Sequence, residues 1–517
     1  MKIAGHWDIS GFGDAIPGEL NIDEQARSVV LSFKAKLQWS SVREFPQDMR
    51  QDVLYGMSVY ETPIVLVDCF VRFIKFYNDG QYEMGEGVVE ATYALEGSGI
   101  DQSKGLLYNN VEVDFGEIGE WARICSFVST QEKSSCGVNY SYKWNSIQQA
   151  ELPLFDGKVV CFFAGASFPG TPTWTKELVL RQDIKVAMVY PKPVAFQEIA
   201  KDVRRIREII SLATGKRMGV IGAAVSFWSS NPFNSSGTPK ARRCTLKVHV
   251  GNHIVPHVSI PDTLDYLFTL PELASVARRE KDWGLRFDKL QPSIELYLSP
   301  IVFDEKNIRV KFLSLMQAIE LLHALTFGND AANIVDRLKV TISFDGADDE
   351  AIMKFLFGPN GKCNRPDAGL KLRLFDLLYR KSGWPQEFPF GLDIYSFVDK
   401  LKNTRNYYTH YNPIDKGKAF AEDNLLIVIR FMTSIFKYHI LKALGFSEQF
   451  ALARMDYDVT GLVRLHNTPA NKDEWDAPSN CAIVECKESQ VATNCVKDVH
   501  EKRETMEADP KQTKSDR

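Results

Sequence analysis

The sequence lacks the features of several common classes of protein. Its nine cysteines include no Cys-x-x-Cys pair, so we expect reduced thiols and no zinc cluster. The N-terminal residues MKIAGHWDIS contain no apolar signal segment. The uncharged run 220–239 ends in turn-forming residues, which predicts a loop rather than a membrane span. These absences predict a cytoplasmic protein without a membrane segment.

An excess of charge is also absent. Against 62 Lys and Arg residues stand 66 Asp and Glu residues, a net charge of -4, which argues against a protein that coats nucleic acid indiscriminately. Any nucleic-acid site must therefore be local. A chain of 517 residues is too long for one hydrophobic core, so we expect several domains.

The first 193 residues have the pattern of a β-rich domain. Segments 31–37 and 111–115 alternate apolar and polar residues, the period of half-buried strands. The run 64–77 is rich in β-branched and aromatic residues and predicts a strand buried on both faces. The sequence PGEL at 17–20 predicts a turn.

A change of period at residue 194 marks the next region. Apolar residues at helical spacing predict a helix over 194–214 that ends at Gly215, with a basic face that we expect to be solvated. Segment 245–250 again alternates apolar and polar residues, which predicts a short strand. Residues 194–300 are therefore expected to form a linker helix and a mixed α/β middle domain.

The last structured third is predicted to be helical. Amphipathic stripes over 312–326, 370–379, 394–408 and 425–444 predict an antiparallel helical bundle over residues 301–465. Beyond residue 466 the apolar residues are too isolated to offset an ordering cost of roughly 1–2 kcal/mol per residue, which predicts a disordered tail. The expected fold class is multidomain α+β, with an all-α bundle at the C-terminal end.

The stretch KNTRNYYTHYNP at 402–413 carries the strongest chemical signal. Arg405 and His410 differ by five positions, about 140° around an ideal helix, so they would bracket a groove. Pro413 disfavours helical geometry at Asn412, so the helix should end close to His410. A guanidinium matches two phosphate oxygens, and an imidazole exchanges protons near neutral pH. This pair favours phosphodiester chemistry.

A scheme without metal or cofactor follows from these two groups. His410 would take the proton of a ribose 2′-hydroxyl, the oxygen would attack the adjacent phosphorus, and Arg405 would stabilise the developing charge. The products would be a 2′,3′-cyclic phosphate and a 5′-hydroxyl. DNA has no 2′-hydroxyl, so the substrate must be RNA. The proton donor for the leaving oxygen is unassigned, and a second copy of the site across a dimer axis could provide it.

Local charge and aromatic residues agree with an RNA site. Between Lys371 and Lys418 nine basic and five acidic residues give a local net charge of +4. Lys402, Tyr407 and Tyr411 are the expected RNA-binding residues, and stacking of a base on an aromatic ring contributes ~1–3 kcal/mol. Tyr408 is expected to belong to the core instead.

The motif has a family context. VDKLKNTRNYYTHYNP, late in a helical bundle and followed by another long helix, resembles the HEPN ribonuclease superfamily and looks most like the ApeA-type HEPN proteins of bacterial anti-phage defence. GHWDISG and IPGEL resemble the N-terminal domain of the same proteins. The resemblance implies that Arg405 and His410 are the catalytic pair and that Asn406 supports them. It also implies an acidic or polar residue on an earlier helix, for which Glu320 is the candidate.

The same resemblance implies a biological setting. It predicts a homodimer with both motifs at the interface and cytosolic action without a metal ion. It also predicts a toxic activity that is restrained until infection, with N-terminal domains that sense or restrain. A structured RNA such as tRNA is the expected substrate, and a phage-derived trigger is the expected activator.

Other interpretations stay open at this point. Arg405 and His410 could be structural, bonded to a carboxylate and a carbonyl, because an arginine followed by a nearby histidine recurs at Arg243 and His249. Glu320 could be a solvated helix residue. The domain could also be a catalytically silent HEPN module that binds RNA or a partner protein. A metal site at His249, His253 and His257 would need a helix, which Gly251 and Pro256 interrupt.

Overall fold

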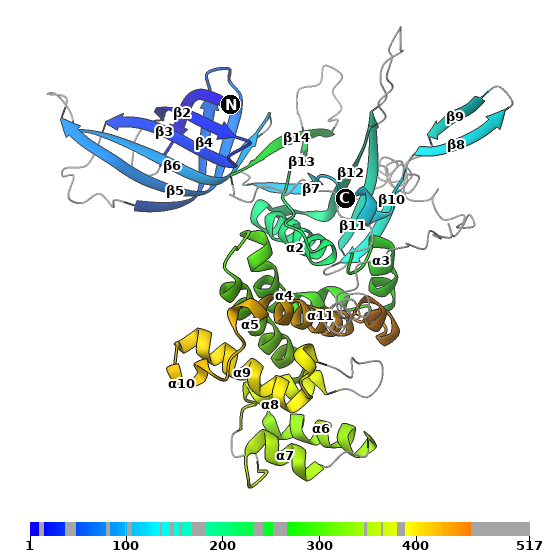
Figure 1. Cartoon of the computed structure of the whole chain (residues 1–517). Helices are drawn as coiled ribbons and strands as arrows, with labels where there is room; N and C mark the ends of the chain where they lie inside the picture. The colour runs from blue at the N-terminus through cyan, green and yellow to red at the C-terminus, as the bar shows by residue number, and fades with distance from the viewer. Residues whose placement is uncertain are drawn as a thin grey trace, which may run out of the picture.

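A β-sheet region lies above a helical region in the computed structural model of the chain (Figure 1). This arrangement confirms the expected fold class, β-rich at the N-terminal end and all-α at the C-terminal end. The predicted disordered tail, residues 466–517, lies outside the described residues. The structure describes residues 1–9, 15–36, 48–78, 83–98, 100, 106–125, 127–134, 137–144, 149–154, 158–167, 181–230, 241–251, 266–345, 349–362, 366–379 and 388–455.

The first six strands close into an antiparallel barrel. Their order is β6-β3-β2-β1-β4-β5, and β5 pairs back onto β6. The interior has a hydrophobic core of its own, which includes Trp7, Leu20 and Leu31. The strand bounds are β1 Lys2–Asp8, β2 Ile16–Asp23, β3 Ser28–Lys36, β4 Asp48–Ser58, β5 Pro63–Asn78 and β6 Glu83–Glu96.

The turn predicted at PGEL is wrong, because Pro17 to Leu20 lie inside β2. Ile16, Leu20 and Ile22 point into the barrel and are buried. Burial of these alternating residues outweighs the local preference of Pro17 and Gly18 for a turn.

Strand β5 is buried on both faces in its first half, as its composition predicts. Ile64 and Leu66 belong to the barrel core, whereas Val65 and Val67 belong to a second core that extends into the helical region. Beyond these residues the strand alternates between buried and exposed positions. This strand therefore lies between the two cores.

The barrel continues into an open sheet through β6. The first part of β6 pairs with β3, and its last residues, from Tyr93 to Glu96, pair with β14. The sheet then runs β14-β13-β7-β12-β11-β10. The bounds are β14 Ala241–Val250, β13 Gly222–Ser230, β7 Leu107–Asp114, β12 Arg181–Ala195, β11 Lys158–Ser167 and β10 Gln149–Leu154, with a separate hairpin of β8 Phe127–Ser134 and β9 Gly137–Trp144.

The strand expected over 245–250 in a separate middle domain belongs to this same sheet as β14, and the loop predicted over 220–239 is wrong for Gly222–Ser230, which form β13. β13 hydrogen bonds to β7, and β14 hydrogen bonds to β6, so both insert between strands of the expected N-terminal domain. This pairing joins the two expected domains and does not support a boundary at residue 193. Pairing between strands far apart in sequence leaves no trace in local periodicity.

Helix α2 (Phe196–Thr214) confirms the predicted helix and lies beneath the open sheet in Figure 1. It ends at Gly215 in the left-handed conformation, with φ 64°. The expectation of a fully solvated basic face is wrong. Arg205 is buried and forms ion pairs with Asp202, at 3.2 Å, and with Asp288.

The helical region contains the four predicted helices and others besides. Helix α4 was not predicted, since residues up to 300 were expected to form a mixed domain, and this helix runs through Pro292 and Pro300. The predicted helices are α5 Ile308–Phe327, α8 Leu370–Leu378, α9 Ile394–His410 and α11 Leu425–Ala443; the others are α1 Gly119–Ala122, α3 Leu270–Arg279, α4 Trp283–Val302, α6 Ala331–Asp345, α7 Asp349–Phe357 and α10 Pro413–Lys416.

Two segments among the described residues are long and apolar enough to cross a membrane, Ile308–Phe327 and Glu422–Ala443. Both carry buried polar groups that make hydrogen bonds within the helical region. His323 of α5 contacts Asp376, and His439 of α11 contacts the carbonyl oxygen of Leu377. Their apolar residues belong to the second core, as Phe312 and Phe431 illustrate.

Candidate active site

Helix α9 ends where the sequence predicts. Its first turn is capped by Asp393, whose carboxylate accepts a hydrogen bond from the Ser396 N–H at 2.7 Å. The last helical residue is His410. Tyr411 then adopts a left-handed conformation, with φ 49°, and its N–H donates to the carbonyl oxygen of Tyr407. His410 is therefore presented at the C-terminal end of the helix.

Arg405 faces α5 from the middle of this helix. Its Nε lies 3.3 Å from Oε1 of Glu320, and each side chain is 27% exposed. The contact is an ion pair, since this buried oxygen receives no hydrogen bond of good geometry from the described residues. Glu320 is therefore a partner of the motif rather than a solvated helix residue.

The environment of Glu320 is costly for its charge. Burial raises the pKa of this carboxyl, while the positive charges of Arg405 and Arg373 act in the opposite direction. The ion pair with this carboxylate holds the guanidinium of Arg405 against α5.

His410 is exposed, and among the described residues its side chain makes no hydrogen bond or ion pair. Within a single chain, the side chain of His410 does not contact that of Arg405. Five residues of α-helix separate the two along the axis by about 7.5 Å. Neither group is sealed in the core, since Arg405 is 27% exposed and His410 is exposed.

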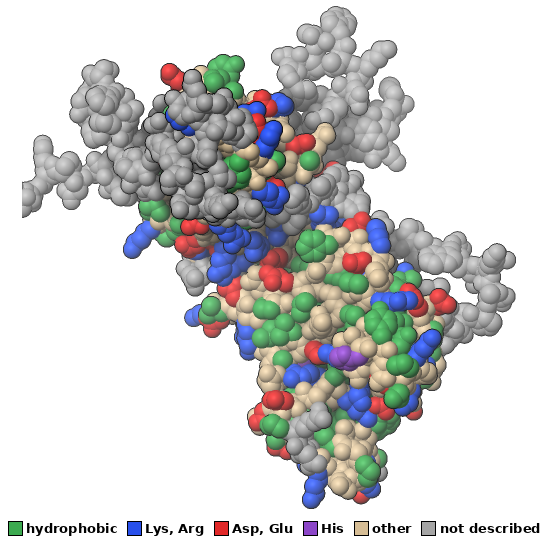
Figure 2. Space-filling view, turned by 90° about the vertical axis from the view of Figure 1, so that its left-hand side faces the viewer, with side chains coloured by type: hydrophobic (Ala, Val, Ile, Leu, Met, Phe, Trp, Pro, Cys, Tyr) green, Lys and Arg blue, Asp and Glu red, His purple; other side chains and the backbone are tan. Residues whose placement is uncertain are grey.

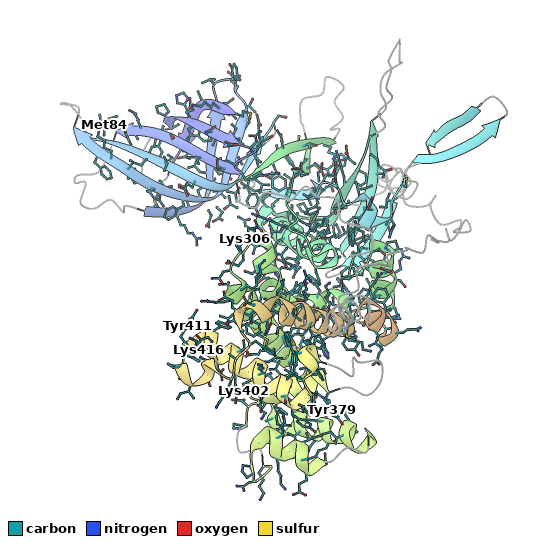
Figure 3. All side chains as sticks on the ribbon, in the orientation of Figure 1. Met84, Lys306, Tyr379, Lys402, Tyr411 and Lys416 are labelled. Carbon is teal, nitrogen blue, oxygen red and sulfur yellow. The ribbon has the colours of Figure 1, made fainter. Side chains whose placement is uncertain are left out.

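The remaining predicted residues lie along the same helix. Lys402, Asn406 and Tyr407 are half-buried, and Tyr411 is 56% exposed. The rings of Tyr407 and Tyr411 meet edge to face, with centroids 5.8 Å apart. Figure 3 shows Lys402 on α9 and Tyr411 beyond its end, near Lys416.

Tyr408 belongs to the core, as expected. It is only 6% exposed, and its ring packs edge to face against Phe312 of α5, with centroids 6.4 Å apart. The guanidinium of Arg309 lies over the same ring at 5.7 Å and pairs with Glu422. These contacts fix the C-terminal turn of α9 between α5 and the start of α11.

Thr404 adds a second anchor beside the motif. Its hydroxyl is buried, donates to the carbonyl oxygen of Lys400 at 2.6 Å and accepts from the N–H of Phe420 at 2.8 Å. The second bond ties α9 to the segment that follows α10. The turn that carries His410 is therefore held at both of its ends.

A buried polar network behind α9 was not predicted. Nε2 of His323 lies 2.7 Å from Oδ2 of Asp376, and Arg337 contacts the same oxygen. Arg373 donates to the carbonyl oxygen of Ala368 at 3.0 Å and lies 3.4 Å from Nδ1 of His323. The sequence did contain one sign of this network, because Glu320 and His323 are three residues apart and so share one face of α5.

Part of the local positive charge is engaged in contacts within the chain. Lys371 pairs with Asp399 at 2.9 Å, and Lys400 lies 5.0 Å from the ring of Phe420. Arg380, Lys381 and Glu387, which were counted in the excess, lie outside the described residues. Lys402 is the one predicted RNA-binding cation.

The alternative of a metal site formed by three histidines on a helix is wrong for His249, the one of the three that the structure describes. His249 lies in strand β14, is buried, and contacts Glu96 at 3.0 Å. His253 and His257 lie outside the described residues. Within the described part of the chain, no group of three or more His, Cys, Asp or Glu side chains could hold a metal ion.

Comparison with known families covers both regions of the chain. The family model of ApeA N-terminal domain 1 matches residues 2–276, more than half of the chain. The model of the Apea-like HEPN domain matches residues 313–450, which include Glu320, Arg405 and His410. Neither a curated protein nor a solved structure matches the chain. The two matches confirm the resemblance in the sequence: the chain belongs to the ApeA-like HEPN family of anti-phage defence proteins.

Proposed function

We propose that this protein is an endoribonuclease that uses Arg405 and His410 and needs no metal ion. One observation carries the proposal: Glu320 pairs with the guanidinium of Arg405, which is 27% exposed on α9, while the end of the same helix presents the exposed imidazole of His410. Membership of a family with ribonuclease-related HEPN domains supports it.

The reaction divides between the two side chains. His410 takes the proton of the ribose 2′-hydroxyl as a general base, and the 2′-oxygen attacks the adjacent phosphorus. Arg405 binds the phosphoryl oxygens, on which negative charge increases in the transition state. The 5′-oxygen leaves and takes up a proton, which gives a 2′,3′-cyclic phosphate and a 5′-hydroxyl end.

A homodimer completes the site in this proposal. Because Arg405 and His410 lie about 7.5 Å apart along one helix, a second α9 across a two-fold axis would bring another His410 toward the leaving oxygen as a proton donor. Tyr411 and Ile414, 56% and 74% exposed, provide apolar surface near the end of α9. Lys402, Tyr407 and Tyr411 would contact the RNA, and Asn406 would support the catalytic pair.

In this proposal the enzyme acts in the cytoplasm, on a structured RNA such as tRNA, as part of abortive infection. The barrel and open sheet would sense a phage-derived trigger or restrain the nuclease. This role is supported by the continuous hydrophobic core, because the second core runs from the open sheet into the helices that carry Glu320 and Arg405. Such a continuous core can transmit a rearrangement of one part to the other.

The alternative is a silent HEPN module that only binds RNA or a partner protein. Incubation of the purified protein with total RNA in excess chelator separates the two. We expect cleavage with 2′,3′-cyclic phosphate ends, lost in both Arg405→Ala and His410→Ala. Intact RNA with retained binding would support the silent module, and cleavage that persists in His410→Ala would refute His410 as the base.

A further inference from the structure

A cavity lies where α2, the helix beneath the open sheet, meets helices α4 and α5. Its volume is about 520 Å³, within the range of small-molecule sites. Its apolar lining includes Leu298, Val302 and Phe303 of the α4 segment with Leu321 of α5. Its polar lining includes Arg204, Arg207, Glu208 and Ser211 of α2 with Glu295 of α4.

Glu208 is the unusual residue in this cavity. Its side chain is only 7% exposed, and its Oε2 has no hydrogen-bond partner among the described residues. Burial, and next the neighbouring carboxylate of Glu295, raise the pKa of Glu208 to about 7. A buried polar atom without a partner is costly, so a group that donates a hydrogen bond to it would be favoured here.

Two arginines, Arg204 and Arg207, provide positively charged hydrogen-bond donors in the same cavity. Arg204 is exposed and Arg207 is half-buried, and among the described residues neither forms an ion pair within 4.0 Å. Burial lowers the pKa of Arg207, and the Glu208 carboxylate acts against this shift. Planar guanidinium groups of this kind pair with phosphate and stack on flat rings.

We propose that this cavity binds a purine nucleotide. The phosphate would pair with Arg204 and Arg207, N–H groups of the base would donate to Glu208, and the flat base would lie against the apolar wall. A simple anion leaves Oε2 of Glu208 without a donor, and a purely apolar ligand leaves the arginines without a partner. A nucleotide provides the phosphate, the donors and the apolar surface together.

The cavity lies between the sheet region and the helical region, so a ligand bound in it would contact both. Its walls come from α2, which packs beneath the sheet, and from α4 and α5, which belong to the helical region. Leu321 is adjacent in sequence to Glu320, the partner of Arg405. Figure 2 shows acidic and basic side chains close together on the face where the sheet region meets the helical region. Binding itself does not depend on ribonuclease activity.

Calorimetric titration of the full chain with GMP and, separately, AMP tests the proposal. We expect saturable one-to-one binding of at least one nucleotide, and weakening by about tenfold or more in Arg204→Ala, the loss of roughly 1.4 kcal/mol. Lys201→Ala is the matched control, because Lys201 is exposed on the same helix and does not line the cavity. Titrations repeated in Arg405→Ala exclude binding at the nuclease motif.

Three results would overturn the proposal. They are no saturable binding of either nucleotide by folded protein, wild-type affinity in Arg204→Ala, and binding of inorganic phosphate as tight as that of the nucleotide. Glu208→Gln supplies a second test, since it keeps the shape of the side chain and removes its charge. We expect it to change the ratio of GMP to AMP affinity, and an unchanged ratio would refute the contact between the base and Glu208.

Discussion

Nε of Arg405 lies 3.3 Å from Oε1 of Glu320, and this ion pair joins the motif helix α9 to α5. The contact uses the Nε side of the guanidinium. A guanidinium has five N–H donors in a fixed plane, so a carboxylate that holds one edge leaves the others for a phosphate. We therefore propose that Glu320 is a positioning residue for Arg405.

Glu320→Gln should lower RNA cleavage by about a hundredfold while RNA binding changes little, because a small misplacement of a catalytic group is costly in rate. Single-turnover cleavage and equilibrium binding of the same RNA measure the two effects separately. Gln317→Ala, a change at an exposed residue of α5, is the control and should cleave normally. Wild-type cleavage by Glu320→Gln would contradict the positioning role.

Asp376→Asn should destabilise the helical region by about 3 kcal/mol, because it leaves His323 and Arg337 beside a neutral partner in a buried site. Burial alone would raise the pKa of Asp376, but the hydrogen bond from His323 and the charge of Arg337 outweigh it and lower this pKa. The stabilisation is therefore present at neutral pH and is lost as the pH falls through the lowered pKa.

Urea unfolding at pH 7 and in acid measures this difference. The matched control is Asp336→Asn, a change of the same chemistry at an exposed residue of α6. An equal and small effect of both substitutions would show that the network contributes nothing to stability.

The motif helix could be predicted from sequence because every determinant is local. The apolar stripe of Phe397, Leu401 and Tyr408 sets the buried face, and Pro413 sets the end. The choice of Glu320 came from the family resemblance rather than from local pattern. The network of His323, Asp376 and Arg373 is formed by two helices that the sequence does not place against each other, so it was missed.

The limits elsewhere have the same physical origin. Helix α4 contains Pro292 and Pro300, which locally disfavour a helix, and its packing on α5 outweighs that cost. The insertion of β13 and β14 between β7 and β6 depends on long-range strand pairing. The cavity at Glu208 could not be predicted either, since its walls come from three helices.

Tyr411 and Tyr408 should respond to substitution in opposite ways. Tyr411→Asn removes an exposed ring, while asparagine tolerates the left-handed backbone at this position, so stability should change little. RNA affinity should fall by ~1–3 kcal/mol if the ring stacks on a base. Tyr408→Ala empties a buried site and should cost about 3–5 kcal/mol of folding free energy.

Thermal unfolding and RNA-binding titrations of both variants check this contrast. Full RNA affinity in Tyr411→Asn would exclude the ring from the RNA site. Unchanged stability in Tyr408→Ala would contradict its place in the core.

Glu208→Gln should stabilise the protein more at pH 8 than at pH 5. Burial and Glu295 raise the pKa of Glu208 from 4.5 to about 7, so between these values the folded state binds more protons than the unfolded state. The contribution of Glu208 to stability is fully present below pH 4.5 and is lost as the pH rises through 7. The whole change amounts to about 3 kcal/mol.

Glutamine cannot ionise, so the difference in unfolding free energy between the variant and the wild type should grow across this pH range. Glu117→Gln, at an exposed residue, is the matched control and should show no such growth. A difference that stays constant from pH 5 to pH 8 would show that Glu208 ionises as readily as an exposed carboxyl. The cavity would then have no costly charge for a ligand to relieve.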